Sequence, residues 1–162
     1  MPPTDEPRSA SRSMTSDERP GASSPQRTVG RLALGAALAF AGISHLTWSR
    51  QEFQAQVPTW LPLDPDLVVV ASGVVEVLLG SALVAARGRQ RVAVGWVVAA
   101  FFVAIFPGNI SQLVTRTDAF GLDTDQARAV RLLFQPVLVL WALWSTGAWR
   151  AWRERRRTGA PA

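Results

Sequence analysis

Long apolar stretches separated by short polar segments dominate the sequence. They cover residues 29–46, 67–86, about 92–114 and about 129–149, and the third is interrupted at Pro107. Each has close to the roughly 20 residues that an α-helix needs to cross about 30 Å of hydrocarbon. The pattern predicts an all-α integral membrane protein in which four spanning helices form a bundle, with a break in the third helix at Pro107.

The two ends of the chain lack this pattern. Residues 1–28 are rich in Pro, Ser, Arg and acidic side chains, a composition that predicts a disordered cytoplasmic tail. Residues 29–149 form the predicted transmembrane domain, and residues 150–162 a basic cytoplasmic tail. The first apolar stretch also has features of a cleavable signal, because small residues flank Phe40. We expect it to be retained, since the polar segment before it is long for such a signal.

Composition adds constraints on chemistry. Hydrophobic residues make up 48% of the chain, which would also suit a soluble domain, so their distribution carries the prediction. There is no cysteine, which excludes disulfides, thiolate metal sites and a CxxC redox pair. Redox work would therefore need a cofactor from elsewhere. The net charge of +5 comes from arginines placed at helix ends, so we expect contact with the lipid bilayer and no nucleic-acid partner.

Arginine positions predict the orientation. Arginines predominate in the N-terminal segment, in the turn between the second and third helices, and at the C-terminus, whereas the other two connections are acidic on balance. Cytoplasmic segments of membrane proteins carry the excess of Lys and Arg. We therefore expect a multi-pass protein of the cell (cytoplasmic) membrane with both termini in the cytoplasm.

Glu76 lies halfway along the second apolar stretch, about 13 Å from its outer boundary at about 1.5 Å per helical residue. An ionisable group at that depth costs several kcal/mol unless it has a partner, and such groups are enriched at functional sites. Gly73 and Gly80 share its helix face, and small residues let neighbouring helices approach. Glu76 is therefore expected to point into the bundle, as a site residue or as an ion pair that fixes helix packing.

Five further polar residues are predicted to converge on the outer half of the bundle, above Glu76. His45 lies on a stripe with Gly35, Ala39 and Gly42, and Pro107 and Pro136 each leave a backbone carbonyl without its usual donor. Each residue also has a plainer interpretation, such as interhelical bridging or snorkelling. With a single histidine we expect no metal site. The candidate ligand-binding residues are Glu76, His45, Asn109, Gln112, Arg131 and Gln135.

Several segments together resemble the DoxX-like family of small bacterial membrane proteins. The resemblance covers about residues 29–149 and implies a four-helix membrane bundle in the bacterial inner membrane. The family takes its name from a subunit of a thiosulfate:quinone oxidoreductase, but the lack of cysteine does not favour direct sulfur chemistry here. The segments are GISH at 42–45, VPTWLP at 57–62, the helix with Gly73 and Glu76, FPGNI at 106–110, and RLLFQP at 131–136 followed by Trp141 and Trp144.

Three hypotheses about function follow. In the first, an outward-facing polar pocket, with Pro58, Trp60 and Pro62 as its lid, binds or transports a small amphipathic molecule. In the second, the chain is an accessory subunit of a membrane redox complex whose quinone contacts Gln135, His45 or Arg131. In the third, it is a structural or partner-binding protein without a ligand. We expect no catalytic activity of its own and predict no cofactor outside the quinone alternative, because no nucleophile–base pair or phosphate-binding loop is present.

Overall fold

Six helices make up the part of the chain that the computed structural model describes, residues 24–121 and 123–159, and this part contains no strand. The four long ones have the length and apolar composition needed to cross a membrane, as the sequence predicted for a small integral membrane protein. The helices are α1 (Pro25–Leu46), α2 (Arg50–Gln54), α3 (Pro65–Ala85), α4 (Gln90–Thr115), α5 (Asp125–Thr146) and α6 (Ala148–Thr158).

Helix ends differ from the expected boundaries by a few residues. α1 begins at Pro25, four residues earlier than expected, and the rest of the predicted tail, residues 1–23, lies outside the described part. At the start of α3 the Asp64 carboxylate accepts hydrogen bonds from the backbone N–H groups of Asp66 and Leu67. At the C-terminus, most of the segment expected to be a basic tail is the separate helix α6.

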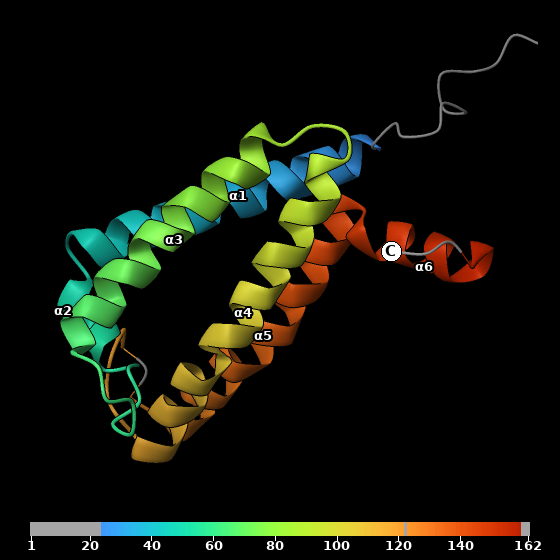
Figure 1. The fold of residues 1–162 in the computed structure, drawn as a ribbon. Coiled ribbons are helices and arrows are strands. Elements are labelled where there is room, and N and C mark those ends of the chain that lie inside the picture. Colours follow the sequence, from blue (N-terminus) through green and yellow to red (C-terminus); the bar gives the residue numbers. More distant parts are fainter. Residues whose placement is uncertain (1–23, 122, 160–162) are drawn as a thin grey trace, which may run out of the picture.

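The long helices form two pairs, α1 with α3 and α4 with α5 (Figure 1). The pairs meet near α6 and diverge toward α2 at the opposite end. Trp141 on α5 joins them near α6 by donating from its indole Nε1 to the Gly30 carbonyl, 3.0 Å away. The bundle is therefore closed at one end and open at the other.

Glycines hold α1 against α3. A Cβ atom on Gly42 would lie 2.5 Å from the Gly73 carbonyl oxygen, and one on Gly80 would lie 2.6 Å from the Gly35 carbonyl oxygen. The backbones therefore touch along both predicted stripes, as small residues permit in membrane helices. This packing confirms that Gly73, Glu76 and Gly80 share a buried face.

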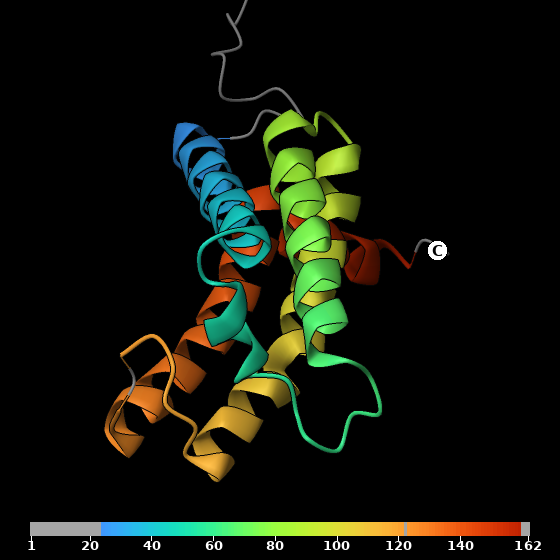
Figure 2. The same cartoon turned by 90° about the vertical axis from the view of Figure 1, so that its left-hand side faces the viewer.

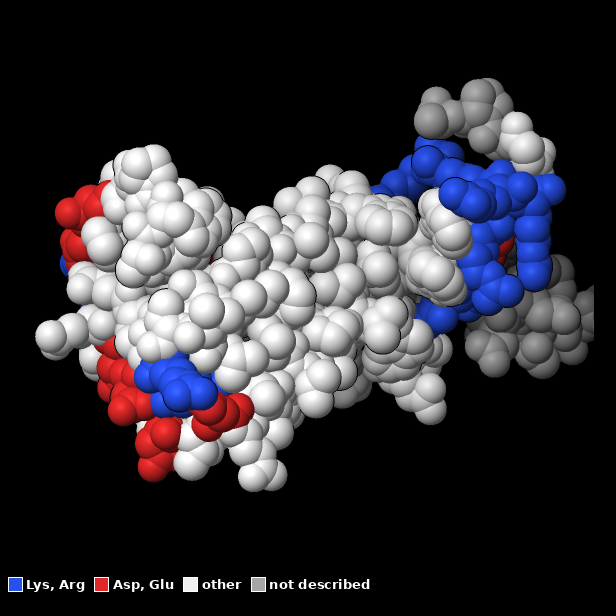
Figure 3. Space-filling view, turned by 90° about the horizontal axis from the view of Figure 1, so that it is seen from below, with Lys and Arg blue, Asp and Glu red and all other residues white. Residues whose placement is uncertain are grey.

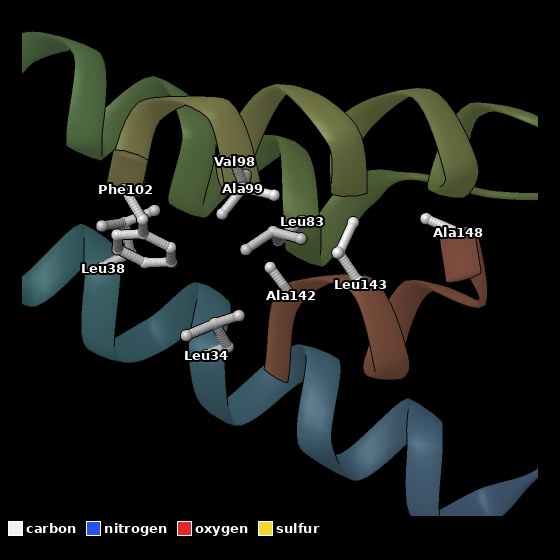
Figure 4. Close-up of a cluster of buried hydrophobic side chains, with 9 residues drawn as sticks. All are labelled: Leu34, Leu38, Leu83, Val98, Ala99, Phe102, Ala142, Leu143 and Ala148. Atoms are coloured by element: carbon white, nitrogen blue, oxygen red, sulfur yellow. The ribbon is translucent and has the colours of Figure 1, made fainter. Parts of the chain in front are cut away.

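The apolar core lies toward the closed end (Figure 4). All four long helices and the first residue of α6 contribute to it, and its side chains range in size from alanine to Phe102. Many other large apolar side chains are exposed, as expected for helix surfaces that face lipid. The core residues are Leu34, Leu38, Leu83, Val98, Ala99, Phe102, Ala142, Leu143 and Ala148.

The expected break at Pro107 was wrong. α4 continues through Pro107, and α5 continues through Pro136. A proline removes one N–H donor, and membrane helices tolerate this when neighbouring helices supply replacement hydrogen bonds. Here Gln135 on α5 donates to the Phe102 carbonyl, one residue from the carbonyl that Pro107 leaves unpaired.

Charge is divided between the two ends of the molecule (Figure 3). Acidic side chains gather at the α2 end, and arginines cover the end that carries α6. The surface between them is almost free of charge, which matches a membrane-spanning belt.

Replacing Gly80 with alanine tests the glycine contact. Alanine is the better helix former by about 1 kcal/mol, so the propensity change alone would stabilise α3. We expect instead that Gly80→Ala destabilises the bundle by about 1–3 kcal/mol, because its Cβ meets backbone atoms of α1. Unfolding of the purified protein in mixed micelles, followed by circular dichroism as sodium dodecyl sulfate is added, measures the effect.

Ser81→Ala is the matched control, since Ser81 is the next residue on the same helix and is exposed. A Gly80→Ala protein as stable as the control would contradict the close approach of α1 and α3.

Candidate functional site

A cavity of about 490 Å³ lies between the two helix pairs. It is on the side of the core that faces α2, and Figure 2, viewed from that end, shows α2 between α1 and the diverging α4–α5 pair. Most of its lining is apolar. The polar lining residues are His45, Gln56, Ser72, Glu76, Asn109, Arg131 and Gln135.

Glu76 and His45 meet at one wall of this cavity. Both are buried, with 5% and 7% of their surfaces exposed, and the Glu76 Oε2 atom lies 3.1 Å from His45 Nδ1. The same nitrogen lies 2.8 Å from the Ala41 carbonyl oxygen, which can only accept, so Nδ1 carries the proton and donates to Ala41. Glu76 Oε2 thus has an electrostatic neighbour but no hydrogen-bond donor among the described residues.

An aromatic chain links this wall to Arg131. The His45 ring stacks on Phe53 of α2, with centroids 3.3 Å apart, and Phe53 meets Phe120 edge-on at 4.5 Å. The Arg131 guanidinium lies over the Phe120 ring, 5.0 Å from its centroid. Within residues 24–121 and 123–159 no carboxylate lies within ion-pair distance of Arg131, so the cavity holds a carboxyl and a guanidinium that do not pair with each other.

Helix α2 is fixed by its contacts with α3. Arg50 donates from Nε to Asp66 Oδ1 at 2.6 Å and makes a second bond to the other carboxylate oxygen, while Gln54 donates to Oδ1 at 3.0 Å. The hydrogen bond to Asp66 raises the pKa of Arg50, which therefore stays charged. This network holds Phe53 against His45.

Asn109 and Gln135 bridge α4 and α5. Asn109 Nδ2 donates to Gln135 Oε1 at 2.9 Å, and Gln135 Nε2 donates to the Phe102 carbonyl at 2.6 Å. Both ends of the Gln135 amide are therefore engaged in helix packing, although the residue also lines the cavity.

Not all of the remaining predicted site residues line the cavity. Gln112 is almost fully buried and donates to the Thr117 carbonyl, outside the cavity lining. Of the three predicted lid residues, Pro58 and Trp60 line the cavity, whereas Pro62 is exposed and does not. Five of the six candidate ligand-binding residues thus surround one space, and Gln112 instead supports the loop after α4.

Some residues that shape the site or the fold were missed by the sequence reasoning. Gln56 follows α2 and lines the cavity, and its Nε2 is buried without a partner in the described part of the chain. Arg31 donates to the Leu83 and Val84 carbonyls at the end of α3. Arg128 bonds both Asp118 and Asp125. The spacing of Asp125 and Arg128 on one helix could have indicated their ion pair, whereas Arg31 bonds a segment far away in the sequence and no local pattern marks Gln56.

Two residues that line this mostly apolar cavity, Glu76 and Gln56, each have a buried atom that makes no hydrogen bond within the described part of the chain, Glu76 Oε2 and Gln56 Nε2, although Oε2 lies 3.1 Å from His45 Nδ1. Leaving such an atom without a hydrogen bond costs about 1–3 kcal/mol. The described residues include no cluster of three or more side chains suited to holding a metal ion.

One comparison with known proteins finds a match. The model of the family described as "Domain of unknown function (DUF8561)" matches residues 34–146, from the middle of α1 to the end of α5. No curated protein and no solved structure matches the chain.

The Asn109–Gln135 bridge is testable by substitution. Gln135→Leu keeps the side-chain volume and removes both hydrogen bonds, so it should destabilise the bundle by about 1–3 kcal/mol. Asn109→Ala should then add little in the Gln135→Leu background, because its partner is already lost. Detergent-based unfolding of the two single variants and the double variant measures the coupling; fully additive effects would refute the bridge.

Proposed function

Since the chain belongs to the family described as a domain of unknown function, DUF8561, we propose its function from its own cavity: it is a small integral membrane protein that binds a small amphipathic molecule between its two helix pairs. The four long apolar helices support the membrane location. The cavity supplies the space, and its mostly apolar lining with a few polar groups is typical of ligand sites.

The observation that carries this proposal is the burial and hydrogen bonding of Glu76. Glu76 is 5% exposed, lines the cavity and has a carboxyl oxygen without a hydrogen-bond donor in the described part of the chain. A purely structural acid would be expected to use both oxygens within the protein, because a buried polar atom without a partner is costly. A ligand with a hydroxyl or amine group would satisfy it.

The rest of the cavity extends this description of the ligand. Gln56 Nε2 supplies a free donor, and the apolar side chains of α1, α3, α4 and α5 supply a surface for a hydrocarbon or aromatic body. The ligand we propose has at least one proton donor, at least one acceptor and an apolar part. Trp60 and Pro58 lie where such a molecule would enter from the α2 end.

Orientation is part of the proposal. The arginines at the α6 end and the acids at the α2 end support placing both termini in the cytoplasm. The cavity then opens toward the outer side of the cell membrane. The resemblance to DoxX-like proteins, which implies a four-helix membrane bundle, is likewise a proposal.

A second candidate is a quinone-contacting subunit of a membrane redox complex. The free donor on Gln56 and the guanidinium of Arg131 favour it, since a quinone carbonyl accepts hydrogen bonds. Of the three residues we expected to contact a quinone, Gln135 is already engaged and His45 donates to Ala41, which leaves Arg131.

Topology is tested with single cysteines, because the natural sequence has none. We expect that a membrane-impermeant maleimide labels Asp123→Cys in intact cells, and that it labels Arg155→Cys only after the membrane is permeabilised. The reverse pattern would place the cavity mouth toward the cytoplasm.

Ligand chemistry is tested with 4-octylphenol and its methyl ether, which differ in one hydroxyl donor. We expect the purified protein to bind the phenol about tenfold more tightly, because pairing a buried acceptor relieves a cost of about 1–3 kcal/mol. Glu76→Leu should abolish this preference. Isothermal titration calorimetry in detergent micelles measures both affinities.

Ser72→Ala is the control, since Ser72 also lines the cavity but its hydroxyl already bonds the Val69 carbonyl. Tighter binding of decylubiquinone, which only accepts hydrogen bonds, would favour the redox alternative. Binding of none of the probes would favour a structural role.

A further inference from the structure

A second cavity, of about 170 Å³, lies at the end of the bundle opposite α2. It forms where the start of α1, the end of α5 and the start of α6 come together. Two arginines, Arg27 and Arg150, line it beside Leu140, Trp144 and Trp149. It is separate from the cavity that contains Glu76 and shares none of its lining residues.

The two arginines face this space without acidic partners. In the described part of the chain, no carboxylate lies within ion-pair distance of Arg27 or Arg150. Two guanidiniums lining one small cavity repel each other, and an anion between them would remove that repulsion. Guanidinium groups bind phosphate through paired, charge-assisted hydrogen bonds.

The chain turns sharply at this cavity. Gly147 adopts a left-handed conformation with φ of 77°, which glycine tolerates without strain, and α6 then runs sideways from the end of α5 (Figure 1). The Trp149 and Trp152 rings lie in contact, tilted by 33° with centroids 5.0 Å apart, and the Arg156 guanidinium lies 4.3 Å from the Trp152 centroid. A short helix with tryptophans and arginines beside the end of a spanning helix is typical of the membrane interface.

The remaining walls are apolar and open to the side of the bundle. Leu140 is 63% exposed, and Trp144 and Trp149 are each 45% exposed. Leu140 and Trp144 lie in the last turns of a helix suited to spanning the membrane, so their exposed surfaces would face acyl chains just below the headgroups. A soluble anion would gain nothing from these walls.

We propose that this cavity binds one anionic phospholipid, with its phosphate between Arg27 and Arg150 and its acyl chains along Leu140 and Trp144. The site lies at the membrane interface whichever way the protein is oriented. It does not depend on the proposed function of the larger cavity. Binding there would anchor α6 against the bundle and hold the start of α1 beside the end of α5.

Native mass spectrometry of the full chain from micelles that contain phosphatidylglycerol and phosphatidylcholine tests the proposal. We expect the natural protein to retain one phosphatidylglycerol in preference to phosphatidylcholine. The double variant Arg27→Gln/Arg150→Gln should bind this lipid about thirtyfold more weakly, because each arginine near a membrane surface contributes about a fivefold gain in affinity for an anionic lipid. Arg150→Gln alone, at an exposed position, should show about a fivefold loss if the double variant does not fold.

The matched control is Arg155→Gln/Arg157→Gln, which removes the same charge from the exposed end of α6 outside the cavity. It should keep the bound lipid. Equal loss in both double variants would overturn the proposal in favour of general charge attraction, and retention in both would overturn it outright. Displacement of the lipid by millimolar glycerol 3-phosphate would assign the arginines to a soluble phosphate instead.

Discussion

The contact of α1 with α3 through glycines is the constraint on which the rest of the structure depends. Gly42 lies against the Gly73 carbonyl, and a Cβ on Gly73 would fall 2.8 Å from the Cβ of His45. This contact allows little sliding, since even a methyl group would meet backbone. It therefore sets the register at which His45 stands beside Glu76 in a buried environment. A looser interface would leave the carboxyl facing lipid, where it would cost several kcal/mol.

Helices α4 and α5 are joined by side-chain hydrogen bonds, and the two helix pairs diverge to leave the cavity between them. α4 and α5 each contain a proline, and an amide bridge from Gln135 joins them beside Pro107. The pairs share a core only toward α6 (Figure 4). Toward α2 they diverge, and the segment after α2 passes so close to α4 that a Cβ on Gly108 would lie 2.8 Å from the Gln56 carbonyl oxygen. The space thus lies between α1, α3, α4, α5 and the segment after α2, with a mostly apolar lining.

Helical periodicity explains what could be predicted from the sequence. The four helices and the shared faces of Gly73, Glu76 and Gly80 follow from a spacing of three and four residues, because such positions lie on one side of a helix. The partners of long side chains do not follow from it. Arg131 was expected to converge with the other polar residues above Glu76, yet its guanidinium lies over the Phe120 ring, and Arg31 reaches across to the end of α3. Gln112 was expected in the same site, but its side chain donates to the Thr117 carbonyl of the following loop. These outcomes depend on how the helices pair, which the apolar pattern leaves open.

The unpaired atoms of the larger cavity place opposite demands on a ligand. Glu76 Oε2 needs a donor, whereas Gln56 Nε2 needs an acceptor. A molecule that only accepts, such as an oxidised quinone, satisfies Gln56 and leaves the carboxyl unpaired, but its reduced form carries hydroxyls that can do both. A simple alcohol or phenol meets the same two demands without redox chemistry. Under the proposed function, a ligand therefore needs a proton donor for Glu76 as well as an acceptor for Gln56, because leaving either buried atom unpaired costs about 1–3 kcal/mol.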